Sequence, residues 1–190
     1  MTESIPLDVA VSSRFNDDLT IPNSGNGTVD MGAYEYGPLA LVSAVSRKMH
    51  GSYGPYDISL PLDPAMGTGV ECRKLGPTTV VLTFSDTLTA ASAWTSAGTV
   101  TGVTVDNKQV TVQLSGAPNA SCVVLTVSTI PGLQGDNGVH IGCLYGDATG
   151  DGKVNVLDLV ATRNNMNRML TPTTFRMDVD SSGYSNVMDL

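Results

Sequence analysis

The segment VTVDNKQVTVQL, residues 103–114, decides the fold class of this chain. Apolar and polar residues alternate on both sides of the turn formers Asp106-Asn107-Lys108, which is the pattern of a β-hairpin with one buried face. The alternation places these side chains on buried faces: Val103, Val105, Val110, Val112 and Leu114. Residues 79–84 and 121–128 predict further strands, and no helical pattern separates them. We therefore expect a small antiparallel β-sandwich over residues 45–142.

Composition narrows the functional classes. The chain has 190 residues, with 10 Lys and Arg against 18 Asp and Glu, a formal net charge of -8. Clustered cations are needed to neutralise phosphates, so this balance argues against nucleic-acid binding. Aromatic residues make up 5% and glycine is frequent, as in β-rich extracellular modules. No apolar run is long enough for a transmembrane segment, and if the protein is secreted, its export signal lies outside this chain.

Cysteine and histidine give weaker indications. The three cysteines, Cys72, Cys122 and Cys143, show no C-x-x-C pairing, which disfavours a zinc cluster. A disulfide between Cys72 and Cys122 and buried free thiols are both compatible with their positions beside expected strands. His50 and His140 are isolated in the sequence, which disfavours a metal role for either.

Two acidic loops near the C-terminus carry the strongest chemical signal. Each places oxygen-bearing residues at positions 1, 3, 5, 9 and 12, with glycine at position 6 and a backbone carbonyl at position 7, the spacing with which a tightly turned loop surrounds Ca²⁺. In the first loop the expected ligands are Asp147, Thr149, Asp151, the carbonyl of Lys153, Asn155 and Asp158. In the second loop, which begins 31 residues later, they are Asp178, Asp180, Ser182, the carbonyl of Tyr184, Asn186 and Asp189. The sequence therefore predicts two calcium sites, the first being the tighter.

The flanks of the loops differ from those of an ordinary EF-hand. Residues 138–145 have no helical period, whereas residues 158–170 can form a helix that ends before Pro172. A loop with an exit helix but no preceding helix, occurring twice and closing with Asp, resembles a type I-like dockerin with tandem calcium F-hand loops. The resemblance covers residues 146–190, and Leu190 falls where the second exit helix should begin.

The resemblance implies a protein partner. Dockerins attach secreted proteins, mostly polysaccharide-degrading enzymes, to cohesin modules on a scaffold or cell surface, as in cellulosome-like assemblies. Loop positions 10 and 11, which often contact the cohesin in that family, fall on Val156, Leu157, Val187 and Met188. They differ from the hydroxyl pairs of the best-known dockerins, so the resemblance does not give partner specificity. We expect Arg163 and Arg168 to flank this apolar contact.

The upstream segments also bear resemblances. The stretch GTVDMGAYE, residues 27–35, resembles the closing segment of secreted bacterial parallel β-helix proteins, although 1–37 could instead be a disordered acidic leader. Residues 45–51 and 69–73 look like parts of a β-sandwich module that precedes dockerins. We therefore expect a multi-module, mainly β chain: the end of a β-helix (1–37), a linker (38–44), a small antiparallel sandwich (45–142) and a small α calcium-binding dockerin of EF-hand-like loops (143–190), truncated in its second repeat.

These expectations favour a calcium-dependent anchoring tail of an extracellular or cell-surface protein. The alternative is the C-terminal part of a polysaccharide-degrading lyase or glycoside hydrolase whose catalytic region lies upstream. Glycoside hydrolysis usually needs two carboxyl groups that face each other, and the acids outside the calcium loops are scattered. We therefore expect no catalytic residues in this chain. A calcium-stabilised spacer without a partner is a third possibility.

Overall fold

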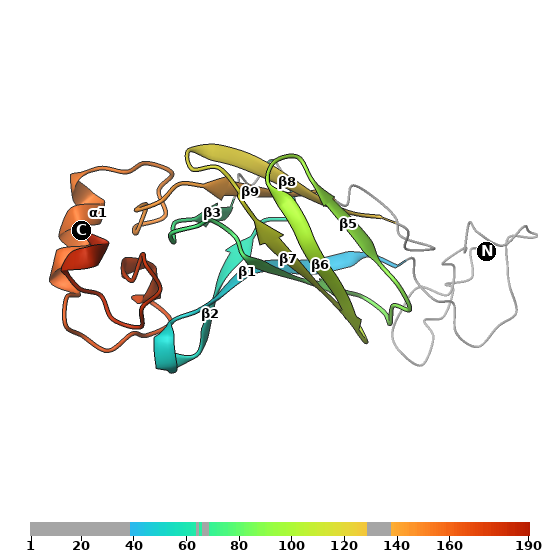
Figure 1. Ribbon diagram of the computed structural model, residues 1–190, viewed down its shortest axis with the longest axis horizontal. Coiled ribbons are helices and arrows are strands. Elements are labelled where there is room, and N and C mark those ends of the chain that lie inside the picture. The colour runs from blue at the N-terminus through green and yellow to red at the C-terminus, as the bar shows by residue number, and fades with distance from the viewer. Residues whose placement is uncertain (1–38, 64, 66–68, 129–137) are drawn as a thin grey trace, which may run out of the picture.

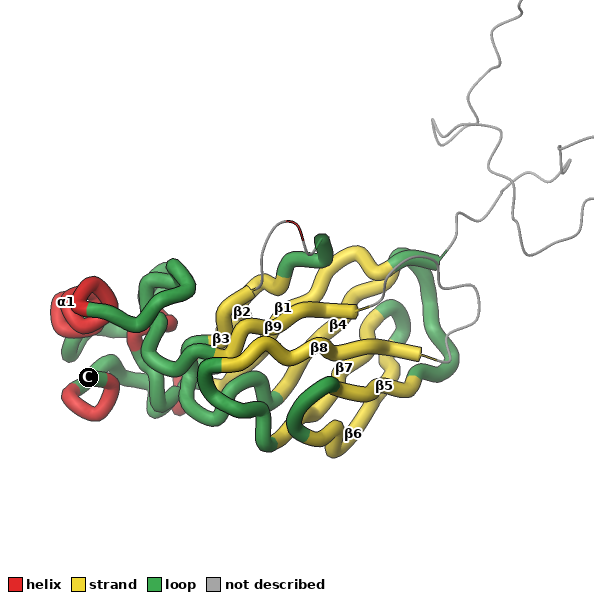
Figure 2. Tube along the Cα trace, turned by 90° about the horizontal axis from the view of Figure 1, so that it is seen from above, coloured by secondary structure: helices red, strands yellow, loops and turns green. Residues whose placement is uncertain are grey.

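The computed structural model describes residues 39–63, 65, 69–128 and 138–190. The expected β-helix end, residues 1–37, and the first residue of the expected linker lie outside these ranges. Two β-sheets occupy most of the described chain, and short helices and loops gather at one end of the strands (Figure 1; Figure 2).

The first sheet is wholly antiparallel and contains the predicted hairpin. Its strand order is β2-β1-β4-β7-β6, comprising β1 Leu41–Met49, β2 Pro55–Leu60, β4 Thr79–Phe84, β6 Thr99–Asp106 and β7 Gln109–Ser115. The register pairs Val103 with Val112 and Val105 with Val110, so the hairpin is confirmed. Asn107 turns the chain with φ +57°, a conformation that Asn tolerates better than most residues.

The second sheet is mixed. Its order is β3-β9-β8-β5, comprising β3 Gly69–Glu71, β5 Ser92–Thr95, β8 Ser121–Ser128 and β9 Gly138–Cys143. β3 and β9 run parallel, with Glu71 opposite Cys143. The expectation of purely antiparallel strands is therefore wrong at this edge, because β3 is a three-residue strand that the sequence pattern did not reveal.

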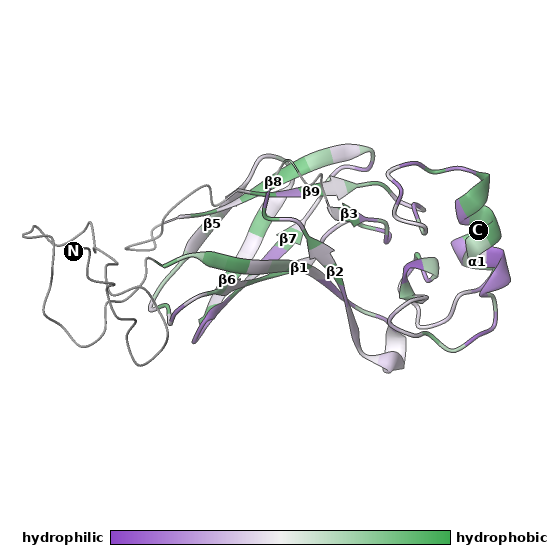
Figure 3. Ribbon diagram, turned by 180° about the vertical axis from the view of Figure 1, so that it is seen from behind, coloured by the Kyte–Doolittle hydropathy of each residue, from purple (hydrophilic) through white to green (hydrophobic). Residues whose placement is uncertain are grey.

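The core lies between the two sheets. The alternating residues predicted to point inward are buried in β7 and β8, including Val112 and Val123 at 0% exposure. Val103 and Val105 are half-buried and pack against the same core. Figure 3 shows the apolar stretches of β1 and β8, and further apolar residues on the distant helix α1.

The C-terminal part of the predicted fold class is wrong. The structure shows a mainly β molecule whose described residues include one α-helix, α1 Val156–Asn164, of nine residues. The rest of residues 143–190 forms loops and two three-residue 3-10 turns, η3 Phe175–Met177 and η4 Val187–Asp189. A small α dockerin module is therefore not what the chain forms.

The predicted exit helix, residues 158–170, ends early for a local reason. Asn164, Asn165 and Asn167 follow in close succession, and Asn competes with helical hydrogen bonding through its short side chain. The Asn165 side chain donates to the carbonyl of Ala161, and Asn167 takes a left-handed conformation with φ +58°. Beyond the end of the helix, Met169 is exposed and Leu170 is buried.

The cysteines are free thiols. Cys72 and Cys143 are buried and Cys122 is exposed, so the Cys72–Cys122 disulfide does not form. Burial raises the pKa of both Cys72 and Cys143 to about 11, so these thiols stay protonated at neutral pH. Within the described ranges, we find no helix with the length and apolar character that membrane crossing requires.

Candidate metal centre

The first carboxylate of each loop holds the turn in the same way. Asp147 accepts the Asp151 N–H at 3.1 Å on Oδ1 and the Gly152 N–H at 2.9 Å on Oδ2. Asp178 accepts the Ser182 N–H at 3.0 Å on Oδ1 and the Gly183 N–H at 2.8 Å on Oδ2. Corresponding donors thus reach corresponding oxygens in the two loops.

The last carboxylate of each loop repeats this agreement. Asp158 accepts the Thr149 N–H at 2.9 Å and the Asn155 N–H at 2.8 Å. In the second loop, Asp189 accepts the Asp180 N–H at 3.0 Å and the Asn186 N–H at 2.8 Å. The two segments therefore share the hydrogen bonds that their first and last carboxylates accept from positions 5 and 6 and from positions 3 and 9.

Backbone conformation and capping agree as well. Positions 4 and 6 are left-handed in both loops, at Gly150 and Gly152 and again at Ser181 and Gly183. Asn155 and Asn186 each cap the following turn in a reciprocal capping box with the closing Asp. Each loop consequently ends in a helical turn: α1 begins at position 10 of the first loop, and η4 covers positions 10 to 12 of the second.

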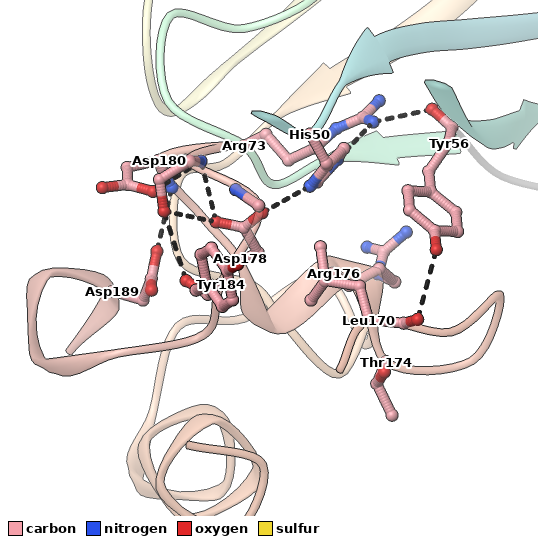
Figure 4. A network of polar contacts seen from close by, with 12 residues as sticks. His50, Tyr56, Arg73, Leu170, Thr174, Arg176, Asp178, Asp180, Tyr184 and Asp189 are labelled. Atoms are coloured by element: carbon pink, nitrogen blue, oxygen red, sulfur yellow. Dashed lines mark hydrogen bonds and ion pairs between the residues drawn. The ribbon is translucent and has the colours of Figure 1, made fainter. Parts of the chain in front are cut away.

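The second loop brings three carboxylates together. One oxygen each from Asp178, Asp180 and Asp189 lies within 4.8 Å of the others (Figure 4). Calcium binds oxygens at about 2.3–2.6 Å, so ligands on opposite sides of one ion are separated by up to about 5 Å. The Tyr184 carbonyl also lies close to two expected ligands, at 3.2 Å from Ser182 Oγ and 3.1 Å from Asn186 Nδ2. The three carboxylates are therefore close enough together to hold a metal ion.

The first loop is arranged less compactly around its acids. Asp151 is exposed and accepts the Lys153 N–H at 2.9 Å, and the Thr149 hydroxyl donates to Asp158 at 2.8 Å. In the part of the chain that the structure describes, the second loop holds the one cluster of three potential metal-binding acids. This arrangement favours metal binding at the second loop, whereas the sequence led us to expect tighter binding at the first. The order of affinities stays a prediction.

The carboxylates of the second loop have opposed electrostatic environments. Burial raises the pKa of Asp189, and the carboxylates of Asp180 and Asp178 act in the same direction, while backbone N–H donors only partly oppose them. Burial would also raise the pKa of Asp178, but hydrogen bonds from His50 and the Gly183 N–H outweigh it, so this pKa lies below its usual range. A divalent cation among these groups would offset their mutual repulsion.

The closing carboxylate of the first loop, Asp158, has a lowered pKa because its hydrogen bonds outweigh the effect of burial. Burial would raise the pKa of Asp158, yet N–H donors from Thr149 and Asn155 together with the Thr149 hydroxyl hold that pKa below its usual range. The two closing aspartates therefore differ in charge environment although their hydrogen bonds correspond.

The expected partner residues lie on the surface. Val156, Leu157, Val187 and Met188 are 65%, 58%, 68% and 76% exposed, and we call these four side chains the apolar docking set. Arg163 lies exposed in the last turn of α1. Arg168 is also exposed, but it lies beyond the end of α1, so the two arginines do not share one helix as expected.

Comparison with known proteins adds no identification. No family model matches the chain, and no curated protein or solved structure matches it. The functional argument therefore rests on the loops and on their surroundings.

Sequence reasoning missed His50. Its Nδ1 lies 2.7 Å from Oδ2 of Asp178, and both side chains are fully buried (Figure 4). The two residues are 128 positions apart, so no local motif could connect them.

Proposed function

We propose that residues 143–190 form a calcium-ordered docking segment that attaches this protein to a cohesin-like protein partner. The observation that carries the proposal is that the two loops agree in the hydrogen bonds of their first and last carboxylates and in the left-handed backbone at positions 4 and 6. Such agreement over segments 31 residues apart is characteristic of a repeated binding unit.

Calcium suits the chemistry of both loops. Each supplies three Asp carboxylates, an Asn side chain and a backbone carbonyl, all hard oxygen donors of the kind that Ca²⁺ prefers. Bound calcium would neutralise crowded negative charge and fix the loop ends from which α1 and η4 start. Because calcium is abundant outside cells, this role agrees with an extracellular or cell-surface location.

The apolar docking set supplies the proposed contact with the partner. Its members occupy loop positions 10 and 11, and all four apolar side chains are exposed, so they are available for contact with a partner. Each pair follows the capping Asn of its own loop, so calcium-dependent order in the loop would fix the pair in space. Buried apolar anchors supply most of the affinity in protein interfaces, and Arg163 would contribute mainly to association rate and orientation.

The proposal is tested with the full chain in two steps. Calorimetric titration should show calcium binding that is weakened at one site by Asp151→Ala and at the other by Asp180→Ala. A panel of purified cohesin modules should then bind the chain in calcium and release it in chelator. A chain that binds calcium but no cohesin would support the spacer instead, and a chain that binds no calcium would overturn the proposal.

Charged substitutions separate a docking surface from a structural one. Val156→Asp with Leu157→Lys, and separately Val187→Asp with Met188→Lys, should abolish or weaken cohesin binding and leave calcium affinity unchanged. Val42→Asp is the matched control, since Val42 is 58% exposed on β1, far from the loops. If the chain unfolds on substitution of Val156 and Leu157, they belong to the packed interior and the contact lies elsewhere.

A further inference from the structure

A buried polar chain runs from the β-sandwich into the second loop. It passes from Glu71 through Arg73 and His50 to Asp178, and the side chains of all four residues are fully buried. Figure 4 shows the part of this chain formed by Arg73, His50 and Asp178. Arg73 NH1 lies 3.2 Å from His50 Nε2, and His50 Nδ1 lies 2.7 Å from Asp178 Oδ2. The chain thus links a strand of the sandwich to position 1 of a candidate calcium loop.

The order of donors along this chain follows from the chemistry of arginine. A guanidinium group can only donate, so His50 Nε2 accepts and the ring proton must sit on Nδ1. His50 then donates to Asp178. With Oδ2 held by His50 and by the Gly183 N–H, the Asp178 carboxylate cannot rotate freely, and it keeps its place beside Asp180 and Asp189.

The sandwich holds Arg73 rigidly. Its guanidinium donates twice to Glu71, at 2.7 Å from both Nε and NH2, and also to the carbonyls of Tyr56 at 2.8 Å and Ser46 at 2.9 Å. The Ser46 hydroxyl donates to Glu71 in turn. Burial would raise the pKa of Glu71, but the bonds from Arg73 outweigh it and the pKa lies below its usual range. A buried ion pair with every donor satisfied fixes geometry more than it adds stability.

Backbone contacts bring the same loop against the sandwich. The Gly51 N–H donates to the Ser181 carbonyl at 3.2 Å, and the Lys74 N–H donates to the Val179 carbonyl at 2.7 Å. A Cβ on Gly51 would lie 2.2 Å from the Ser182 carbonyl oxygen, so the two backbones are in direct contact.

Among the described residues, no side chain from the sandwich is hydrogen-bonded to the leading carboxylate of the first loop. Asp147 accepts N–H groups of Gly150, Asp151 and Gly152, all from its own loop. Its bonds outside the loop involve its backbone: the N–H donates to the Leu144 carbonyl at 3.2 Å, and the carbonyl accepts from Arg176 at 3.2 Å.

We infer that His50 is a positioning residue of the second calcium loop, so that loop and sandwich build this site together. The inference rests on the proposed calcium binding. Supporting partners of metal ligands orient them, and their loss commonly lowers metal affinity by about 10- to 100-fold. Calcium bound at the second loop would therefore stabilise the sandwich, and an intact sandwich would raise the affinity of the loop, because linkage is reciprocal.

The first test compares the two sites within one chain. Calcium affinity is measured by calorimetry on the full chain carrying Asp151→Ala, which reports the second loop, or Asp180→Ala, which reports the first. His50→Leu, which removes the donor, should lower the affinity of the second loop by about tenfold or more and change the first by less than about twofold. His50→Asn, whose amide can donate from near the Nδ1 position, should recover most of the loss. His140→Leu is the matched control and should change neither loop.

Each outcome of that test decides one point. If His50→Leu weakens both loops equally, the residue is merely structural and the inference is overturned. If His50→Leu leaves the calcium affinity of the second loop unchanged, the inference is overturned too. If the chain with native His50 binds calcium at neither loop, the proposed function fails as well. If calcium binds but His50→Leu does not change its affinity, only the inference about His50 fails.

A second measurement leaves His50 intact and so does not depend on the folding of its variants. Hydrogen exchange with mass spectrometry follows the amides of β4 and β7, the central strands of the sandwich. Calcium should slow their exchange in the native chain and with Asp151→Ala, but not with Asp180→Ala. The linkage would be overturned if calcium does not change the exchange rate of these amides, or if it slows their exchange as much in Asp180→Ala as in the native chain.

Discussion

The two acidic loops have the same internal geometry in different surroundings. The first loop leaves Asp151 exposed and leads into the nine-residue helix α1. The second loop lies against the sandwich, gathers three carboxylates and leads into a single 3-10 turn. The comparison teaches that local sequence specifies the path of such a loop, whereas the elements packed around it determine how firmly its ligands are held.

The largest expected effect comes from breaking the buried ion pair behind the second loop. Arg73→Met should lower the free energy of unfolding by about 3–5 kcal/mol, because it leaves the Glu71 carboxylate buried without its partner. Urea unfolding in the presence of chelator measures the loss. The double variant Arg73→Met with Glu71→Gln should recover part of it. A loss below about 1 kcal/mol in the single variant would show that the pair is not what holds this end of the sandwich.

The next effect concerns the aromatic contact that precedes the second loop. Phe175 is 7% exposed and stacks on Tyr56 with ring centroids 5.1 Å apart and planes inclined by 4°. Phe175→Ala should lower the free energy of unfolding by about 3 kcal/mol through lost burial and the remaining cavity. Met169→Ala, at a site that is 71% exposed, should change it by less than about 0.5 kcal/mol. Equal effects of the two substitutions would mean that the second loop is not docked through Phe175.

A matched pair of glycines sharpens the comparison directly. Gly152 and Gly183 both occupy position 6 with positive φ, but a Cβ on Gly152 meets nothing within 4 Å, whereas one on Gly183 lies 3.1 Å from the His50 carbonyl oxygen. Gly152→Ala should lower the free energy of unfolding by about 1–2 kcal/mol, and Gly183→Ala by roughly 2–3 kcal/mol. Thermal unfolding of both variants in chelator gives the difference. If Gly152→Ala is the more damaging, the docking contact at His50 is not close.

The smallest expected effect is the loss of a helix cap, and here substitution in the first loop should reduce stability more than substitution in the second. Asn155 caps the nine-residue α1, whereas Asn186 caps a turn of three residues. Asn155→Ala should reduce the free energy of unfolding by about 1 kcal/mol, because the cap stabilises all nine residues of α1. Asn186→Ala should reduce it by less than half of that, because its cap stabilises a turn of only three residues. Helical circular dichroism during urea unfolding measures both. A larger loss for Asn186→Ala would indicate that η4 is anchored by contacts beyond its cap.

The sequence predicts what is encoded locally. Alternation of valine with polar residues was sufficient for the β6–β7 hairpin and for the inward face of β8, since strand period and burial agree there. The turn of each acidic loop was likewise predictable from local spacing, whereas calcium binding by its residues stays a prediction. Helix length was not, because Asn165 and Asn167 compete with the backbone at the point where apolar spacing still suggested a helix.

Contacts between distant segments could not be predicted. His50 meets Asp178 across 128 residues, and the parallel pairing of Glu71 with Cys143 joins segments 72 positions apart. An isolated buried histidine and an isolated Arg in a strand-rich segment carry no periodic signal, so the polar chain between them was visible only in three dimensions. The prediction of a helical C-terminal module failed because α1 ends at Asn164 and residues 187–189 form only a 3-10 turn.

The parallel pairing of β3 with β9 has a mechanical consequence. After β9 ends, the Leu144 N–H donates to the Glu71 carbonyl at 3.1 Å, and the Gly146 N–H donates to the Cys72 carbonyl at 2.9 Å. The residues between β9 and the first loop are therefore hydrogen-bonded to the segment that contains β3. β1 begins at the opposite end of the molecule from α1 (Figure 1). Tension applied between Leu41 and α1 would therefore load the hydrogen bonds of neighbouring strands together in shear rather than open them one after another. The part of the chain between Leu41 and α1 would therefore resist extension as one unit.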